Sequence, residues 1–363
     1  MAFWVTAALG ASLLLITAGL LVLLICRVVR NRLDALHASR TEEFRPLVLA
    51  AAAGDSDGDE ALKELVSLDR RHWRSVQPSV LFLLSQLQGE GHVALTAVLA
   101  RRGILEEALT DLCRRGRVRR ARAAAVLTLA GPTLREDEQV VVRARAALHG
   151  LLDDRDPTVR AAAVRALGRF GDSTSAALLV AHLRGHRQVA SGLIGHALLQ
   201  IGYPAIECLL DAARCDDVQI RALALELLSL IGDRRSVRQL VDALGDGEGV
   251  VRASAAQALG RMGEPVAVDP LMRMLASDPS PRAASAAAEA LGLIGDQRAV
   301  GALARAASAP HYRVAHASSQ ALTRLGPTGA ARLRELVADG SGAAPHAREA
   351  LALLSLRSGG GVV

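Results

Sequence analysis

The sequence predicts an all-α protein, a right-handed α-solenoid of short helical hairpins preceded by one N-terminal transmembrane helix. Three observations predict it: a stretch that returns later in the chain, glycines at nearly constant spacing, and a long uncharged segment at the N-terminus. The composition agrees, because hydrophobic residues make up 51% of the 363 residues and aromatic residues only 2%. Apolar content carried by alanine and leucine favours packed helices over sheets.

The returning stretch is VRAAAVRALGRFGD at residues 159–172, which recurs as VRASAAQALGRMGE at residues 251–264. A stretch that returns is typical of a structural unit, whereas a catalytic motif normally occurs once. Its glycine recurs with successive spacings of 31, 30, 31, 32 and 31 residues, at Gly171, Gly202, Gly232, Gly263, Gly295 and Gly326. This period is long enough for two short helices and two turns.

Within one unit, apolar residues follow at steps of three and four from Val159 to Phe170, which predicts one buried helix face. Asp156 and Pro157 predict the N-cap and the first helical residue. Gly171 predicts the helix end, because glycine adopts the left-handed conformation at low cost. One such hairpin has too small an apolar face to fold alone, so we expect neighbouring hairpins to stack.

The stretches VRAAAVRALGRFG, IRALALELLSLIG, VRASAAQALGRMG and AASAAAEALGLIG resemble the HEAT repeats, in particular the short variety found in relatives of the phycobilisome lyases. The resemblance covers residues 116–357 and implies HEAT-like helical hairpins stacked in a right-handed solenoid. Such repeats serve many unrelated binding roles. The lyase relatives attach bilins, but nothing in this sequence marks a bilin site. With the membrane segment described next, the chain is identified as a membrane-anchored bacterial member.

The N-terminal segment, residues 3–26, contains 24 residues without a charge. As a helix it would be about 36 Å long, enough to cross a hydrocarbon core of about 30 Å. Phe3 and Trp4 lie where interfacial anchors belong, and Arg27, Arg30 and Arg32 follow the segment directly. The positive-inside rule predicts a single-pass protein of the cell membrane with its N-terminus outside and the repeats in the cytoplasm.

A cleaved signal peptide fits the same segment less well, because a basic N-terminal region is missing and the apolar core is too long. The three arginines set the topology, and they could also bind anionic headgroups. Both roles remain open.

Between the membrane segment and the array we expect a juxtamembrane tether with a first helix (residues 27–58) and degenerate capping repeats (59–115). The acidic stretch GDSDGDE (54–60) predicts a turn, and Pro78 predicts the start of a run of helices at residues 80–87, 93–99 and 105–113. The array follows at residues 116–357, and residues 358–363 predict a disordered tail.

The segment RRGRVRRAR (residues 114–122) holds six arginines in a chain with a net charge of +6. It fits the first helix of a repeat with its arginines exposed, and no aromatic residues lie between them to stack on bases. We therefore do not expect a nucleic-acid partner.

The sequence contains none of the common nucleophile, phosphate-binding, zinc-protease or EF-hand motifs. None of the ten histidines is followed by glutamate, which excludes the paired His-Glu iron ligands of the deoxyhypusine hydroxylases, a related repeat family. His182 and His186 are a weak two-point metal candidate, and the four cysteines lack a metal-binding spacing. We therefore expect no catalytic residue, cofactor or metal, and no small-molecule ligand.

An arginine recurs in the first helix at Arg160, Arg221 and Arg252, with Arg313 just before Val314. We expect these arginines to form a ladder that pairs with acidic residues of neighbouring turns. The predicted function is a non-enzymatic, membrane-anchored scaffold that binds a membrane-associated protein partner. The alternative is a lyase-like enzyme or enzyme subunit with a ligand in the groove, for which titratable residues should converge on the second helices.

Overall fold

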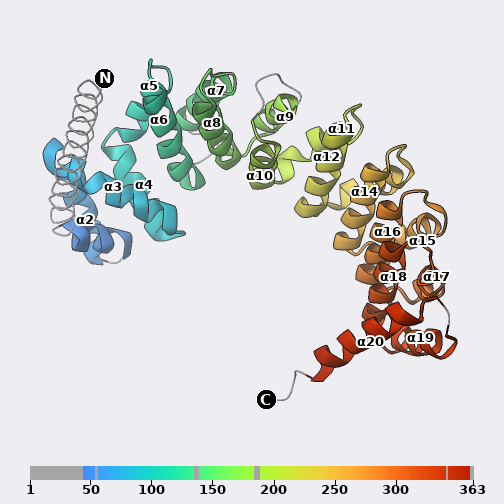
Figure 1. Ribbon diagram of the computed structural model, residues 1–363. Helices are drawn as coiled ribbons and strands as arrows, with labels where there is room; N and C mark the ends of the chain where they lie inside the picture. The colour runs from blue at the N-terminus through green and yellow to red at the C-terminus, as the bar shows by residue number, and fades with distance from the viewer. Residues whose placement is uncertain (1–43, 54–55, 135–138, 184–188, 341, 360–363) are drawn as a thin grey trace, which may run out of the picture. The chain divides into compact units, whose positions relative to one another are not determined.

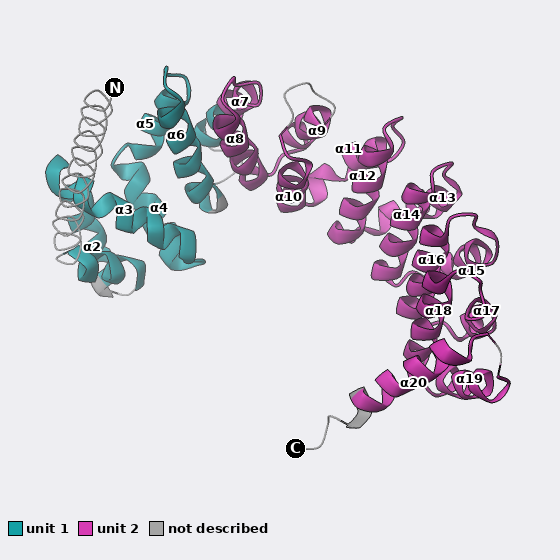
Figure 2. Cartoon of the chain, viewed as in Figure 1, with its two compact units in different colours: residues 1–144 teal, residues 145–363 magenta. Residues whose placement is uncertain are grey.

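The structure is a computed structural model that describes residues 44–53, 56–134, 139–183, 189–340 and 342–359. Every regular element in these residues is an α-helix or a short 3-10 helix, so the predicted all-α class is confirmed. The chain divides into two compact units, Met1–Ala144 and Arg145–Val363 (Figure 2). The predicted membrane helix at residues 3–26, the arginines that follow it and residues 360–363 of the predicted tail lie outside the described residues. The first two residues of the predicted tail, 358 and 359, are helical instead, because the last helix continues to Gly359.

Among the described residues, no single helix has the length and hydropathy of a membrane span. Ser191–Ile201 and Tyr203–Ala212 reach these values only when taken together, across a bend of 118°.

The N-terminal unit is a set of irregularly sized helices (Figure 1). They are Phe44–Ala53, α2 (Ser56–Ser67), α3 (Arg70–Gln86), α4 (Glu90–Arg101), α5 (Ile104–Leu112), α6 (Arg117–Ala130) and the first part of α7 (Gln139–Leu151). Helix α4 contacts α2, α3 and α5, and α6 contacts α3 and α5.

Two predicted boundaries in this unit are wrong. Helix α3 runs through Pro78 instead of beginning there, because Trp73, Val76, Val80 and Leu84 form one continuous buried face across the proline. The burial of that face outweighs the cost of an internal proline, about 3 kcal/mol. The acidic segment predicted as a turn belongs mostly to α2, which begins at Ser56.

The C-terminal unit repeats one hairpin. The first helices are α8 (Pro157–Phe170), α10 (Ser191–Ile201), α12 (Val218–Ile231), α14 (Gly249–Met262), α16 (Pro281–Ile294) and α18 (Tyr312–Arg324). The second helices are α9 (Ser173–His182), α11 (Ile206–Ala212), α13 (Val237–Asp242), α15 (Val268–Ser277), α17 (Val300–Ala306) and α19 (Gly326–Ala338), and α20 (Ala344–Gly359) follows.

Consecutive first helices contact one another from α8 to α18, and α18 contacts α20 (Figure 1). The first helices therefore form one layer. Glycine allows these first helices to pack closely. A Cβ atom at Gly260 of α14 would lie 2.7 Å from the Cα of Ala290, and one at Gly292 of α16 would lie 2.8 Å from the Cα of Ala321. These distances leave no room for a side chain.

The hairpins begin and end as the sequence predicts. Asp156 accepts a hydrogen bond from the backbone N–H of Thr158 at the start of α8, and Asp217 does the same for α12. The six repeat glycines all have positive φ. Five of them follow the last residue of a first helix, whereas Gly326 is the first residue of α19.

Candidate functional site

The recurring arginines bind two consecutive inter-repeat turns. Arg252 donates to both carboxylate oxygens of Asp278, each at 2.7 Å, and its Nη1 donates to the carbonyl oxygens of Asp246 (2.8 Å) and Gly247 (3.1 Å). Arg221 repeats this arrangement one hairpin earlier, with the Asp246 carboxylate at 3.0 and 3.1 Å. One guanidinium thus joins its own turn to the next one, and the bidentate geometry suits arginine better than lysine.

Arg160 shows only the contacts within its own turn, and Arg313 shows neither kind of contact. Arg160 donates to the carbonyl oxygens of Asp154 (2.8 Å) and Arg155 (3.2 Å) in its own turn. Arg313 is exposed and makes no hydrogen bond or ion pair within the described part of the chain. The reason is register: Arg160, Arg221 and Arg252 lie eleven residues before their repeat glycine, whereas Arg313 lies thirteen residues before Gly326. Two residues turn a helical side chain by about 200°.

The carboxylate of Asp278 is held in its charged form. Burial raises its pKa, but hydrogen bonds from Arg252 and from the backbone N–H of Ser280 outweigh burial and leave the pKa below the ordinary value. The side chains of Asp278 and Arg252 are only 4% and 13% exposed. A fixed, paired charge of this kind has the character of a structural contact.

A groove of about 860 Å³ crosses the first helices α10, α12 and α14 and reaches Arg282 of α16. Val189, Gln219, Val250 and Arg282 line it, and each lies thirteen residues before its repeat glycine. One repeat position therefore contributes four of the residues that line the groove. Sequence analysis placed the possible binding groove on the second helices, whereas this groove lies on the first helices.

The chemical character of this groove is mixed. Leu223, Ile220 and Val250 supply apolar surface, and Glu226 and Arg282 supply opposite charges. The carboxylate of Asp217 at its edge is already occupied by the backbone N–H groups of Gln219 and Ile220. No cysteine or histidine is among the described residues that line it. The groove therefore offers apolar contact surface together with the charged groups of Glu226 and Arg282.

The structure describes Cys208 and His182 among the cysteines and histidines considered in the sequence. Burial raises the pKa of the Cys208 thiol to about 11, which disfavours the reactive thiolate. His182 is bound instead to the carbonyl oxygen of Leu178 through Nδ1 at 2.8 Å and lies 3.4 Å from Asp153 through Nε2. His186 lies outside the described residues.

A second groove, of about 570 Å³, lies in the N-terminal unit. Arg70, Arg74, Arg119 and Arg122 line it together with Glu107 and Asp111. Arg119 and Arg122 belong to the arginine-rich segment, and they are exposed as predicted. The interleaved carboxylates reduce the positive charge that a nucleic acid would need.

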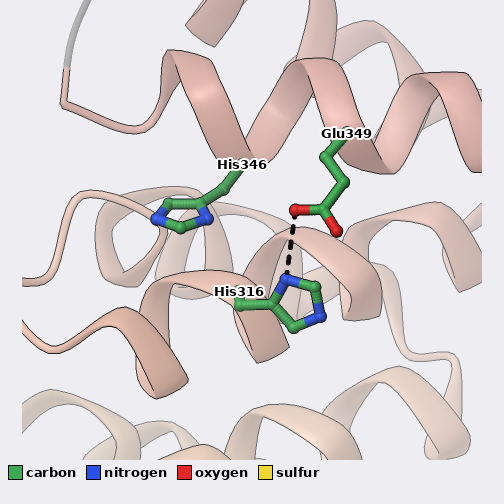
Figure 3. Close-up of side chains that lie close together, drawn as sticks. All are labelled: His316, His346 and Glu349. Carbon is green, nitrogen blue, oxygen red and sulfur yellow. Dashed lines mark ion pairs between the residues drawn. The ribbon is translucent and has the colours of Figure 1, made fainter.

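Three side chains that sequence analysis did not select lie together at the end of the C-terminal unit. His316 comes from α18, and His346 and Glu349 come from α20 (Figure 3). Their ligand atoms all lie within 4.8 Å of one another, so this group could hold a metal ion. A signal existed in the sequence: His316 and His346 are thirty residues apart, which is one repeat period.

The HEAT repeats family profile matches residues 106–198, 206–292 and 269–353, which is more than half of the chain. The chain therefore belongs to the HEAT-repeat family, and its fold is an all-α HEAT-repeat solenoid. The resemblance stated from the repeats is confirmed for the family. A comparison with curated proteins finds no significant match.

Solved structures are similar to this chain at low identity. Kap121p bound to the SUMO protease Ulp1p is 11% identical over 85% of this chain and 41% of its own, with a TM-score of 0.51. Human deoxyhypusine hydroxylase in complex with glycerol is 20% identical over 79% of this chain and 97% of its own, with a TM-score of 0.31. An engineered protein is 18% identical over 85% and 98%, with a TM-score of 0.37. The likeness to Kap121p shows the fold alone.

Proposed function

We propose that this protein is a non-enzymatic scaffold, anchored in the cell membrane by residues 3–26, that binds a protein partner through the groove on α10, α12 and α14. The observation that carries the proposal is the groove itself, which takes four of its lining residues from one repeat position and combines apolar side chains with the opposite charges of Glu226 and Arg282. A HEAT-repeat solenoid is an architecture suited to extended protein contacts. Kap121p, a protein of the same fold, is bound to a protein, Ulp1p.

The anchoring part of the proposal is supported by the sequence. The 24 uncharged residues before Arg27 suffice to cross a bilayer, and the arginines that follow favour a cytoplasmic location for the array. Attachment confines the groove to the membrane surface and raises its effective concentration toward a membrane-associated partner. The partner is accordingly proposed to be a membrane protein or a protein recruited to the membrane.

Proximity labelling in native membranes tests the proposal, with the labelling enzyme fused after Val363. Leu223→Glu changes the groove, and Val266→Glu is the matched control, because Val266 is 62% exposed and does not line the groove. We expect a cytoplasmic or membrane protein to be enriched by the wild type and by Val266→Glu, and to be lost with Leu223→Glu. Deletion of residues 3–26 should also abolish the enrichment.

Each part can fail separately. Equal enrichment with Leu223→Glu and Val266→Glu would show that the partner does not bind in the groove. Enrichment that persists after deletion of residues 3–26 would contradict the proposed membrane anchor. Labelling of extracytoplasmic proteins alone would contradict the proposed orientation, with the array in the cytoplasm.

A further inference from the structure

The C-terminal end of the repeat array brings two imidazoles and a carboxylate together. Helix α20 packs on α18 and α19. His346 and Glu349 are three residues apart on α20, so they lie on the same helix face. That face is directed toward His316 of α18 (Figure 3). Their ligand atoms lie within 4.8 Å of one another.

The His316 side chain is partly buried, with 34% of its surface exposed against 46% for Glu349. Its Nδ1 atom is buried and makes no hydrogen bond, although it lies 3.4 Å from the Oε2 atom of Glu349. A buried polar atom without a hydrogen bond is destabilising unless another partner takes its lone pair. An imidazole nitrogen that lies 3.4 Å from a carboxylate oxygen has the arrangement of two ligand atoms that bind the same metal ion.

The separation of these two atoms matches a metal-bound pair. Zinc binds imidazole nitrogen and carboxylate oxygen at about 2.0–2.1 Å, which in tetrahedral geometry places two ligand atoms about 3.4 Å apart. The His316–Glu349 distance is already 3.4 Å. His346 is the third ligand, because it lies on the same face of α20 as Glu349 and its ligand atom lies within 4.8 Å of the other two.

Tyr312 supports both imidazoles. Its ring stacks on His316 with a centroid distance of 5.6 Å and an interplanar angle of 13°. It meets His346 edge to face at 5.0 Å and 68°. These contacts restrict both rings before any ion binds, which lowers the entropy lost on binding.

We propose that His316, His346 and Glu349 form a site for a divalent transition metal ion, with zinc as the best match, that ties the last helix of the array to α18. Two imidazoles and one carboxylate favour zinc and its neighbours over magnesium and calcium, which take oxygen ligands. Three protein ligands leave one position for water or for a ligand from another molecule. The site is separate from the docking groove, whose lining ends at Arg282.

The first test is calorimetric titration of the full-length, chelator-treated chain with Zn²⁺, beside the variants His316→Gln, His346→Gln and Glu349→Gln. His196→Gln is the matched control, because His196 is an exposed histidine on the first helix α10. We expect one tight site in the wild type and in the control. Loss of any one ligand should weaken binding by at least about 100-fold, since even outer-shell substitutions cost 10–100-fold. Mg²⁺ should not compete.

A spectroscopic test on the wild type does not depend on whether the variants fold. Co²⁺ should produce the visible absorption of a four-coordinate ion, and Zn²⁺ should remove it. Bound Zn²⁺ should also slow amide hydrogen exchange in α20 and leave α10 unchanged. Equal Zn²⁺ affinity in the control and the three ligand variants, or Co²⁺ spectra of a six-coordinate aqueous ion, would overturn the site.

Discussion

Arginine side chains bind backbone carbonyl groups in both compact units, but the two arrangements differ in kind. In the N-terminal unit, Arg102 donates to the carbonyl oxygens of Leu65, Val66 and Leu68 at 2.7–2.9 Å, and its guanidinium lies 4.3 Å from the ring centroid of Trp73. This contact closes the C-terminal end of α2, where carbonyl groups have no partner within the helix. It involves residues that do not recur at the repeat spacing.

In the C-terminal unit, Arg252 also binds carbonyl groups, but its remaining N–H groups go to the carboxylate of Asp278 in the next turn. Arg221 makes the same contacts one repeat earlier. Arg221 and Arg252 thus join three consecutive inter-repeat turns, whereas Arg102 holds one particular pair of segments. The comparison teaches that the array uses a contact that recurs, whereas the Arg102 contact occurs once. The N-terminal unit also holds one contact of the recurring kind, because Arg120 donates to the carbonyl oxygen of Arg114 at 3.2 Å.

The largest effect is expected at the repeated contact. Asp278→Ala leaves the buried Arg252 guanidinium without its carboxylate and should lower the free energy of unfolding by about 3 kcal/mol or more. Asp269→Ala is the matched control, because the Arg298–Asp269 pair is 54% and 61% exposed, and it should have no measurable effect. Urea denaturation followed by circular dichroism measures both. Similar losses for the two variants would mean that the ladder adds no specific stability.

Arg102→Ala tests the contact of Arg102 with the C-terminal end of α2 and with Trp73. It removes three charge-assisted hydrogen bonds and the contact with Trp73, so we expect a loss of about 2–3 kcal/mol. Arg101→Ala is the control, since the Arg101 side chain is exposed and makes no hydrogen bond or ion pair with any described residue. Hydrogen exchange by mass spectrometry should show the loss in α2 and α3 while α14 and α16 keep their protection. Faster exchange throughout both units would contradict the comparison.

The close approach of the first helices gives a smaller effect. Gly292→Ala would place a Cβ atom 2.8 Å from the Cα of Ala321 and should cost about 1–3 kcal/mol through overpacking. Gly150→Ala in α7 has no neighbouring atom within 4 Å and should stabilise by up to about 1 kcal/mol. Thermal unfolding should therefore shift in opposite directions for the two glycines. A higher melting temperature for both variants would show that the helix layer tolerates a wider spacing.

The smallest effect concerns pH. The pKa of Asp278 is lowered in the folded state, so its contribution is present above the unfolded pKa, about 3.9, and is lost as the pH falls through the folded value. The difference in melting temperature between the wild type and Asp278→Asn should be constant from pH 7 to pH 5 and shrink below about pH 4. A difference that grows on acidification would reverse the sign of this linkage.

Much of the repeat architecture was predictable. The glycine period and the apolar steps of three and four correspond to the observed hairpins, because a helix end and a buried face depend on residues within a few positions of one another. The N-terminal unit was less predictable. Pro78 was taken as a helix start, and only the packing of Trp73 and Val76 shows that the helix continues through it.

The site residues divide in the same way. Arg160, Arg221 and Arg252 were selected because they recur, whereas Arg313 was included although it occupies a different register. Arg102 was not predictable, because nothing in its own surroundings distinguishes it from other arginines of the chain. His316 could be distinguished only by its spacing of thirty residues from His346. Their partners lie about 30 residues or more away in the sequence.

By itself the sequence determined the repeat, the helix caps and the family, because each depends on short-range geometry that recurs every thirty residues or so. The tertiary structure alone decided which side chains meet across neighbouring hairpins. It placed Val189, Gln219 and Val250 along one groove and brought His346 and Glu349 to His316. Such contacts depend on the register and distance at which one helix packs on the next, and these follow from the summed packing of many side chains.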